Sequence, residues 1–120
     1  EMRYDAVPGV VYTNPEVAGV GLTEEQAEKS GVRYAVAKLP MAFSGRFVAE
    51  NEGANGLCKV IYDPDKHTVL GVHMLGNPCS EMIFGAAMVI TQGMTIAELQ
   101  RVIFPHPTVS EIIKETLFTI

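Results

Sequence analysis

Short apolar runs separated by turn-forming residues make up the first part of the chain. Runs of about four to eight residues that are rich in Val, Ile, Tyr and Thr are typical of β-strands. We expect strands at residues 10–13, 17–22, 34–39, 56–62 and 68–75, and a further strand with irregular flanks within 41–52. The segment Asp63-Pro64-Asp65-Lys66 joins the last two runs and predicts the clearest β-hairpin of the chain.

Helix signals appear once among the strands and then dominate the C-terminal part. Thr23 and Gln26 have the spacing of a capping box and Gly31 is a natural stop, so a short helix is expected at 24–30. From Ser80 onward the apolar spacing becomes helical, and we expect helices at 80–92, 95–103 and 109–118. Strands followed by helices predict an α+β fold, in which helices, three of them C-terminal, cover an antiparallel sheet of about five strands.

The segment 80–92 has almost no polar side. A helix that is apolar all round is covered on all sides, and one sheet in a domain of this size cannot cover it completely. Two interpretations therefore stand side by side. The segment is either a central core helix, or a helix that packs on the sheet with one side and on a partner surface with the other.

Composition narrows the class of protein. The 120 residues are enough for one domain with a real core, which we place at residues 1–120, and 48% hydrophobic against 19% charged residues argues against disorder. A net charge of -5 without a run of Lys and Arg argues against a nucleic-acid partner. We find no signal peptide or membrane-spanning stretch and expect a cytoplasmic location without a membrane partner. The start at Glu1 indicates a piece of a larger protein.

The cysteine and histidine pattern gives no metal site. Cys58 and Cys79 form no CxxC pair and no ligand cluster with His67 or His73. We expect two buried or half-buried thiols in a reducing compartment, and a disulfide between them stays open.

Candidate chemistry is concentrated in residues 104–111. Prolines on both sides restrict the backbone of His106, and a firmly held imidazole with Glu111 five residues on suits proton transfer near neutral pH. The same residues also fit a capping box in which Thr108 and Glu111 start the last helix and His106 is incidental. The two interpretations are compatible, because Glu111 can serve the helix end and still lie near His106.

Other catalytic and cofactor motifs are missing. The chain has no GxGxxG after a strand, no P-loop and no serine nucleophile elbow, and nothing in it could be the nucleophile that His106 serves. A complete catalytic site would therefore need groups from outside the chain.

Four motifs in register carry a family resemblance. Residues 106–111 resemble the HPT-x-SE signature of the flavoprotein (pyridine nucleotide) disulfide reductases, and residues 11–18, 70–76 and 80–83 resemble three further motifs of their C-terminal domain. Within that family the chain is most similar to the dihydrolipoamide dehydrogenase branch. It departs from many members of that branch at Phe104-Pro105, where they have His-Ala or a similar pair.

This resemblance implies a C-terminal dimerisation domain of a homodimeric enzyme. The FAD and NAD domains and a redox-active CxxxxC would lie upstream, and no cofactor would be bound by this chain alone. The resemblance implies that His106 and Glu111 are a catalytic acid/base pair, that His106 and the Pro107 backbone lie near the partner subunit's FAD, and that the His106–Pro107 bond is cis.

The implied activity is NAD-dependent oxidation of dihydrolipoamide, with a lipoyl-bearing acyltransferase of a 2-oxo acid dehydrogenase complex as partner. The isolated chain is expected to be inactive. Two alternatives stay open: the domain of a sibling disulfide reductase, such as a glutathione reductase-like enzyme, or a non-catalytic dimerisation module.

Overall fold

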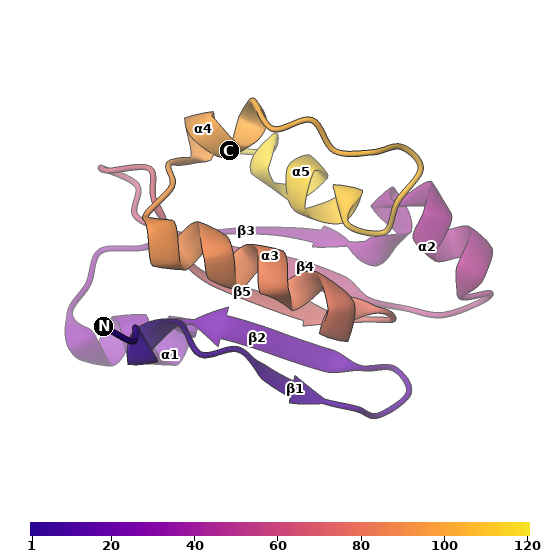
Figure 1. Ribbon diagram of the computed structural model, residues 1–120, viewed down its shortest axis with the longest axis horizontal. Coiled ribbons are helices and arrows are strands. Elements are labelled where there is room, and N and C mark those ends of the chain that lie inside the picture. The colour runs from indigo at the N-terminus through magenta and orange to yellow at the C-terminus, as the bar shows by residue number, and fades with distance from the viewer.

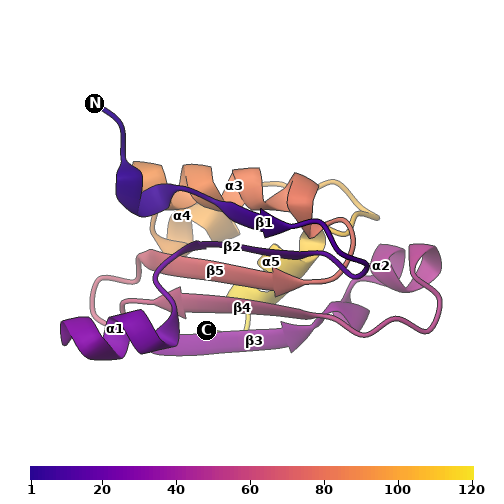
Figure 2. The same ribbon diagram turned by 90° about the horizontal axis from the view of Figure 1, so that it is seen from below.

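A five-stranded antiparallel sheet forms the centre of the molecule. The computed structural model describes residues 1–120. The strands lie in the order β1-β2-β5-β4-β3, and every neighbouring pair is antiparallel. Their bounds are Gly9–Val11, Val17–Gly21, Ala35–Pro40, Leu57–Tyr62 and Val69–Leu75 for β1 to β5. Figure 2 shows β2, β5, β4 and β3 side by side. The predicted α+β fold is confirmed.

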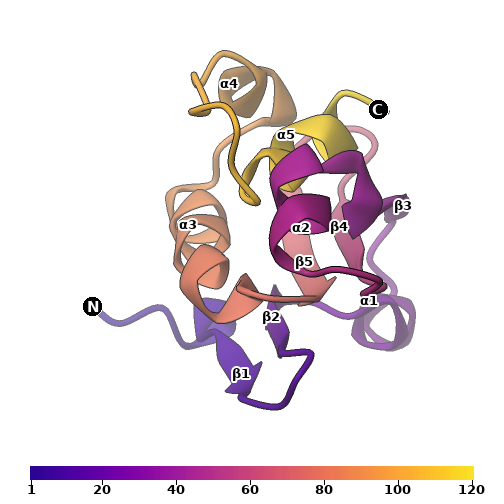
Figure 3. The same ribbon diagram turned by 90° about the vertical axis from the view of Figure 1, so that its right-hand side faces the viewer.

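Five α-helices surround this sheet. They are α1 (Glu24–Ser30), α2 (Gly45–Glu50), α3 (Cys79–Gln92), α4 (Ile96–Gln100) and α5 (Glu111–Leu117), together with the 3-10 turns η1 (Tyr4–Ala6) and η2 (Met41–Phe43). α3 packs on β2 and β5, and α5 packs on β3 and β4 (Figure 1). Seen along the sheet, α3 and α5 lie on one side of it and α1 on the other (Figure 3). None of the helices has both the length and the apolar character to cross a membrane.

The hydrophobic core lies between the sheet and the pair α3 and α5. Val20, Val60 and Val72 come from three neighbouring strands, while Ile83 and Ile112 come from the two helices. Each of these side chains is at most 3% exposed. The helices are therefore held by burial of one apolar side, which is the main source of stability for helices this short.

Local signals placed the hairpin and the first helix correctly. The Asp63 carboxylate accepts hydrogen bonds from the N–H groups of Asp65 and Lys66 and so stabilises the turn between β4 and β5. At α1 the Thr23 hydroxyl accepts from the Gln26 N–H, the Gln26 side chain accepts from the Thr23 N–H, and Gly31 ends the helix at φ 72°. These contacts span only a few residues, so the sequence contains the whole signal.

The strand predicted within 41–52 is wrong. This stretch folds into η2 and α2. The Ser44 hydroxyl caps α2 by accepting from the Phe47 N–H, and Arg46 pairs with Glu50 one turn later. Phe47 is 1% exposed and anchors the helix in the core. The serine cap and the i,i+4 spacing of Arg46 and Glu50 are local helix signals, and the strand prediction overlooked them.

The last two helices are shorter than predicted. α4 begins after the expected Thr95 cap but ends at Gln100, and Val102 and Ile103, at 45% and 91% exposed, belong to a loop. Pro105 disfavours helical backbone at the residue before it. α5 begins at Glu111 rather than at residue 109.

The outer side of α3 is uncovered. Met82, Ile83 and Ala86 face the core, but Phe84 is 68% and Met88 51% exposed. The interpretation of residues 80–92 as a central core helix is therefore wrong for the single chain, because this helix leaves two large apolar side chains exposed.

Candidate functional site

His106 and Glu111 form a direct pair in the loop between α4 and the start of α5. The His106 Nδ1 lies 2.8 Å from Glu111 Oε1 and 3.0 Å from Oε2. The His106 side chain is 82% exposed, whereas that of Glu111 is 8% exposed. The prediction that His106 and Glu111 lie close together is confirmed. The carboxylate is buried and the imidazole is exposed to solvent.

The buried carboxylate determines which ring nitrogen carries the proton. Because a carboxylate accepts hydrogen bonds only, the His106 Nδ1 donates to Glu111. The neutral ring then has its lone pair on Nε2, away from Glu111, as in other sites where a carboxylate orients a histidine. The His106–Pro107 peptide bond is cis, as the family resemblance implies.

Glu111 also holds the backbone of the loop. Its carboxylate accepts from the Thr108 N–H at 3.2 Å, which is half of the predicted capping box. The other half is wrong, because the Thr108 hydroxyl donates to the Pro105 carbonyl at 2.8 Å. Burial raises the pKa of the Glu111 carboxyl, but the Thr108 N–H, His106 and the Lys114 charge together outweigh it, so the pKa lies below its ordinary value.

The N-cap residue of α2 and a residue of its first turn support this loop, and neither was predicted from the sequence. The Ser44 hydroxyl donates to the Thr108 carbonyl at 3.0 Å, and Arg46 Nη1 lies 3.5 Å from the carbonyl oxygen of Pro107. The preference of serine for helix starts could have indicated the cap at Ser44. Its contact with a residue 64 positions away has no local sequence signal.

The remaining histidines and cysteines lie apart from this pair. The half-buried His73 donates from Nε2 to the Leu22 carbonyl at 2.9 Å, and His67 lies exposed on the hairpin turn. Cys58 and Cys79 are free and fully buried. Burial raises the pKa of Cys58 to about 11, although a hydrogen bond with Thr116 opposes part of the shift. No group of three or more His, Cys, Asp and Glu side chains could hold a metal ion.

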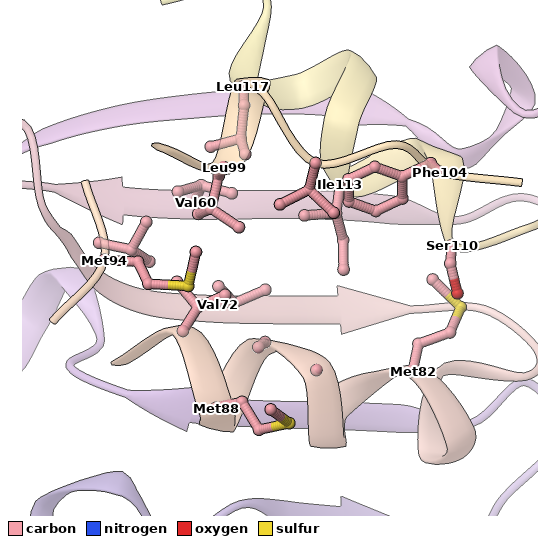
Figure 4. Close-up of a pocket in the computed structure, with 15 residues that line it drawn as sticks. Val60, Val72, Met82, Met88, Met94, Leu99, Phe104, Ser110, Ile113 and Leu117 are labelled. Carbon is pink, nitrogen blue, oxygen red and sulfur yellow. The ribbon is translucent and has the colours of Figure 1, made fainter. Parts of the chain in front are cut away.

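An apolar groove opens between α3, α5 and the sheet. It encloses about 320 Å³. Figure 4 shows Met82 and Met88 of α3 on one side of it and Ile113 and Leu117 of α5 on the other. Phe104, two residues before His106, also lines the groove. The groove therefore joins the exposed side of α3 to the loop that carries the imidazole.

Comparison with known proteins gives consistent matches. The model of the pyridine nucleotide-disulphide oxidoreductase dimerisation domain matches residues 7–117. The mitochondrial dihydrolipoyl dehydrogenase of Pisum sativum is 46% identical over 93% of this chain and 22% of its own length. Leghemoglobin reductase of Glycine max is 45% identical over 93% of this chain and 21% of its own length.

A solved structure of a flavoprotein disulfide reductase has a similar fold. The HOCl-induced flavoprotein disulfide reductase RclA from Escherichia coli superposes with a TM-score of 0.89 at 33% identity, over 97% of this chain and 26% of that protein. The chain spans about a fifth of the length of the curated relatives it matches.

Proposed function

The chain belongs to the pyridine nucleotide-disulphide oxidoreductase dimerisation domain family, and from this membership we propose that it joins the two subunits of a dihydrolipoyl dehydrogenase and supplies their acid/base pair. The observation that carries the proposal is the His106–Glu111 pair, whose exposed ring has nothing to act on within its own chain. Such a pair is useful where a second subunit brings the reacting groups to it.

The proposed reaction is dihydrolipoamide + NAD⁺ → lipoamide + NADH + H⁺. Thiols react as thiolates, and an ordinary thiol is mostly protonated at neutral pH. His106 Nε2 takes the proton of one substrate thiol. The thiolate would then attack the disulfide expected of the upstream CxxxxC pair, so that its S–S bond breaks, a mixed disulfide forms and one thiolate of that pair leaves. Glu111 keeps the ring in the Nδ1–H tautomer and stabilises the imidazolium once it has formed. The proton then leaves to solvent.

The exposed edge of the loop fits a cofactor carried by another subunit. The His106 side chain and Pro107 face outward, while the carboxylate behind them is buried, so a planar group could approach the ring without displacing Glu111. When bound there, FAD supplies the electron transfer between the dithiol and NAD⁺. His106 and the Pro107 backbone are the residues we assign to that contact.

The association surface we propose is the outer side of α3. Phe84 and Met88 are exposed there, and the apolar groove continues from α3 to Phe104. A homodimer built on this side would cover apolar area and keep the His106 loop close to the boundary between subunits. A lipoyl-bearing acyltransferase of a 2-oxo acid dehydrogenase complex is the proposed source of the substrate, because dihydrolipoyl dehydrogenases are among the relatives.

The test is a substrate comparison in the full polypeptide that carries this chain. We expect turnover with dihydrolipoamide and NAD⁺, and little turnover of glutathione disulfide with a reduced nicotinamide cofactor. The reverse preference would identify a sibling disulfide reductase, and inactivity with both substrate pairs would leave only the dimerisation role.

A second arm tests the residue assignment. His106→Gln is expected to lower dihydrolipoamide turnover by about 10²-fold or more, the usual contribution of a general base. His67→Asn is the matched control, since His67 is exposed on a turn at φ 54°, a backbone conformation that Asn tolerates. Near-normal turnover of the His106 variant would remove His106 from the mechanism.

A further inference from the structure

Thr108 makes three hydrogen bonds that hold the His106 loop. Its N–H donates to Glu111, its hydroxyl donates to the Pro105 carbonyl, and its carbonyl accepts from the Ser44 hydroxyl. The first two partners lie within the loop or at its end. Ser44 is the only one of the three that belongs to a distant element, so it ties the loop to the rest of the fold.

The Ser44 hydroxyl is held firmly on its own side. Ser44 is 1% exposed, and its oxygen accepts from the Phe47 N–H at 3.2 Å while it donates to Thr108. Phe47 is 1% exposed, with its ring against Gly76 and η2 residue Met41 beside it. α2 cannot slide without disturbing this packing, so the donor has a fixed place relative to the sheet.

The geometry of the pair depends on where Thr108 lies. One Glu111 oxygen, Oε2, is shared by the Thr108 N–H at 3.2 Å and by His106 Nδ1 at 3.0 Å. If the Thr108 carbonyl loses its donor, the peptide units on either side of Thr108 gain freedom. The carboxylate is then less firmly placed, and the imidazole that it orients turns with it.

We propose that Ser44 is a positioning residue for His106: its hydroxyl fixes the Thr108 carbonyl and thereby the direction in which the imidazole Nε2 points. Ser44 does not touch substrate or cofactor. Its effect on turnover rests on the function proposed above, whereas its effect on the ring can be measured without any activity. Arg46, 3.5 Å from the Pro107 carbonyl oxygen, provides a second and weaker contact from the same helix.

The experiment compares variants of the 120-residue chain by NMR with ¹⁵N-labelled histidine rings. Ser44→Gly removes the donor but leaves an acceptable helix cap, because glycine is among the residues that helices favour at that position. Ser44→Thr keeps both the donor and the cap. Thr23→Ala is the matched control, since it removes a comparable cap from α1 on the other side of the sheet.

The expected signature is a change of tautomer at His106 alone. Wild type, Ser44→Thr and Thr23→Ala should all show the neutral ring with its proton on Nδ1. Ser44→Gly should show a mixture of the two tautomers. An unchanged tautomer in folded Ser44→Gly overturns the proposal, as does an equal change in Thr23→Ala. If Ser44→Gly does not fold, Ser44→Cys replaces it, since a thiol has a similar shape but is a weak donor.

Activity in the full polypeptide completes the test. Ser44→Gly is expected to lower kcat for dihydrolipoamide about tenfold, with KM nearly unchanged and recovery in Ser44→Thr. A tautomer change without a loss of kcat overturns the positioning role. A wild-type protein that does not oxidise dihydrolipoamide refutes the proposed function instead, and the NMR result still decides whether Ser44 orients the ring.

Discussion

Replacing Phe84 with Asp tests whether the outer side of α3 is the surface through which two copies associate. Phe84 is 68% exposed, while its neighbour Ile83 is 3% exposed and packs in the core. Because most of the Phe84 side chain is already in solvent, the substitution removes little packing, and the single chain is expected to keep its fold with a stability change of about 0.5 kcal/mol. It places a charge on the exposed apolar side of α3.

The size of the effect follows from the exposed area. Complete burial of a phenylalanine side chain contributes about 1.5–3 kcal/mol, and about two thirds of that gain is still available at Phe84. A twofold interface contains the substitution twice, so the association free energy is weakened by about 2–4 kcal/mol. Since about 1.4 kcal/mol corresponds to a factor of ten, the dimer Kd should rise roughly 30-fold to 1,000-fold.

The assay is sedimentation equilibrium of the 120-residue chain over a wide concentration range. Wild type should show a dimer that Phe84→Asp shifts to monomer, with an unchanged melting temperature. Val32→Asp is the control: Val32 is an apolar residue, 37% exposed, that follows α1 on the other side of the sheet. A wild type that stays monomeric, or a dimer that tolerates Asp at position 84, would refute the assignment of this surface.

Three further predictions concern single side chains. Phe47→Ala should lower the free energy of unfolding, measured in urea, by about 3–5 kcal/mol, because Phe47 is only 1% exposed. Phe43→Ala is the control and should lower it by less than about 0.5 kcal/mol, since Phe43 is exposed. Similar losses for both variants would contradict the packing of α2. Cys58 and Cys79 should resist iodoacetamide at pH 8 until urea unfolds the chain, because burial raises the pKa of both thiols, that of Cys58 to about 11. Rapid labelling of the folded chain would contradict the burial of these thiols. The melting temperature of wild type should exceed that of Glu111→Gln near neutral pH, because the pKa of Glu111 is lowered in the folded state and its charged form therefore adds stability. This difference should shrink as the pH falls below the ordinary carboxyl pKa of 4.5, since protonation of Glu111 removes that stability. A difference that is independent of pH would show that the Glu111 charge does not stabilise the loop.

Elements with short-range signals could be read from the sequence. The α1 cap, its glycine stop and the turn at Asp63 each depend on residues within four positions of one another. The His106–Glu111 pair belongs to the same class, since the partners are only five positions apart. Proximity along the chain restricts where two side chains can lie, so such pairs are predictable without knowledge of the fold.

Features that depend on the whole fold could not be read in this way. α2 is stabilised by Phe47 in the core, and a single sequence does not state which of two spaced phenylalanines is buried. The contact between Ser44 and Thr108 joins segments 64 positions apart. It exists only because α2 and the loop before α5 meet at the same end of the sheet (Figure 1). Both α2 and the Ser44–Thr108 hydrogen bond therefore depend on tertiary packing.

The residues that orient His106 and the surface proposed for association lie in different parts of the chain. The hydrogen bonds that orient the imidazole all lie within one chain, so we expect its geometry to be independent of association. Phe84 takes part in none of these hydrogen bonds, and its exposed side chain belongs to the surface that we propose for association. Loss of association and loss of the proposed general base, His106, should then be separable. Phe84→Asp should leave the His106 tautomer unchanged in the monomer, and His106→Gln should leave the dimer Kd unchanged. A changed tautomer in Phe84→Asp, or a changed Kd in His106→Gln, would mean that the interface contributes to the geometry of the pair.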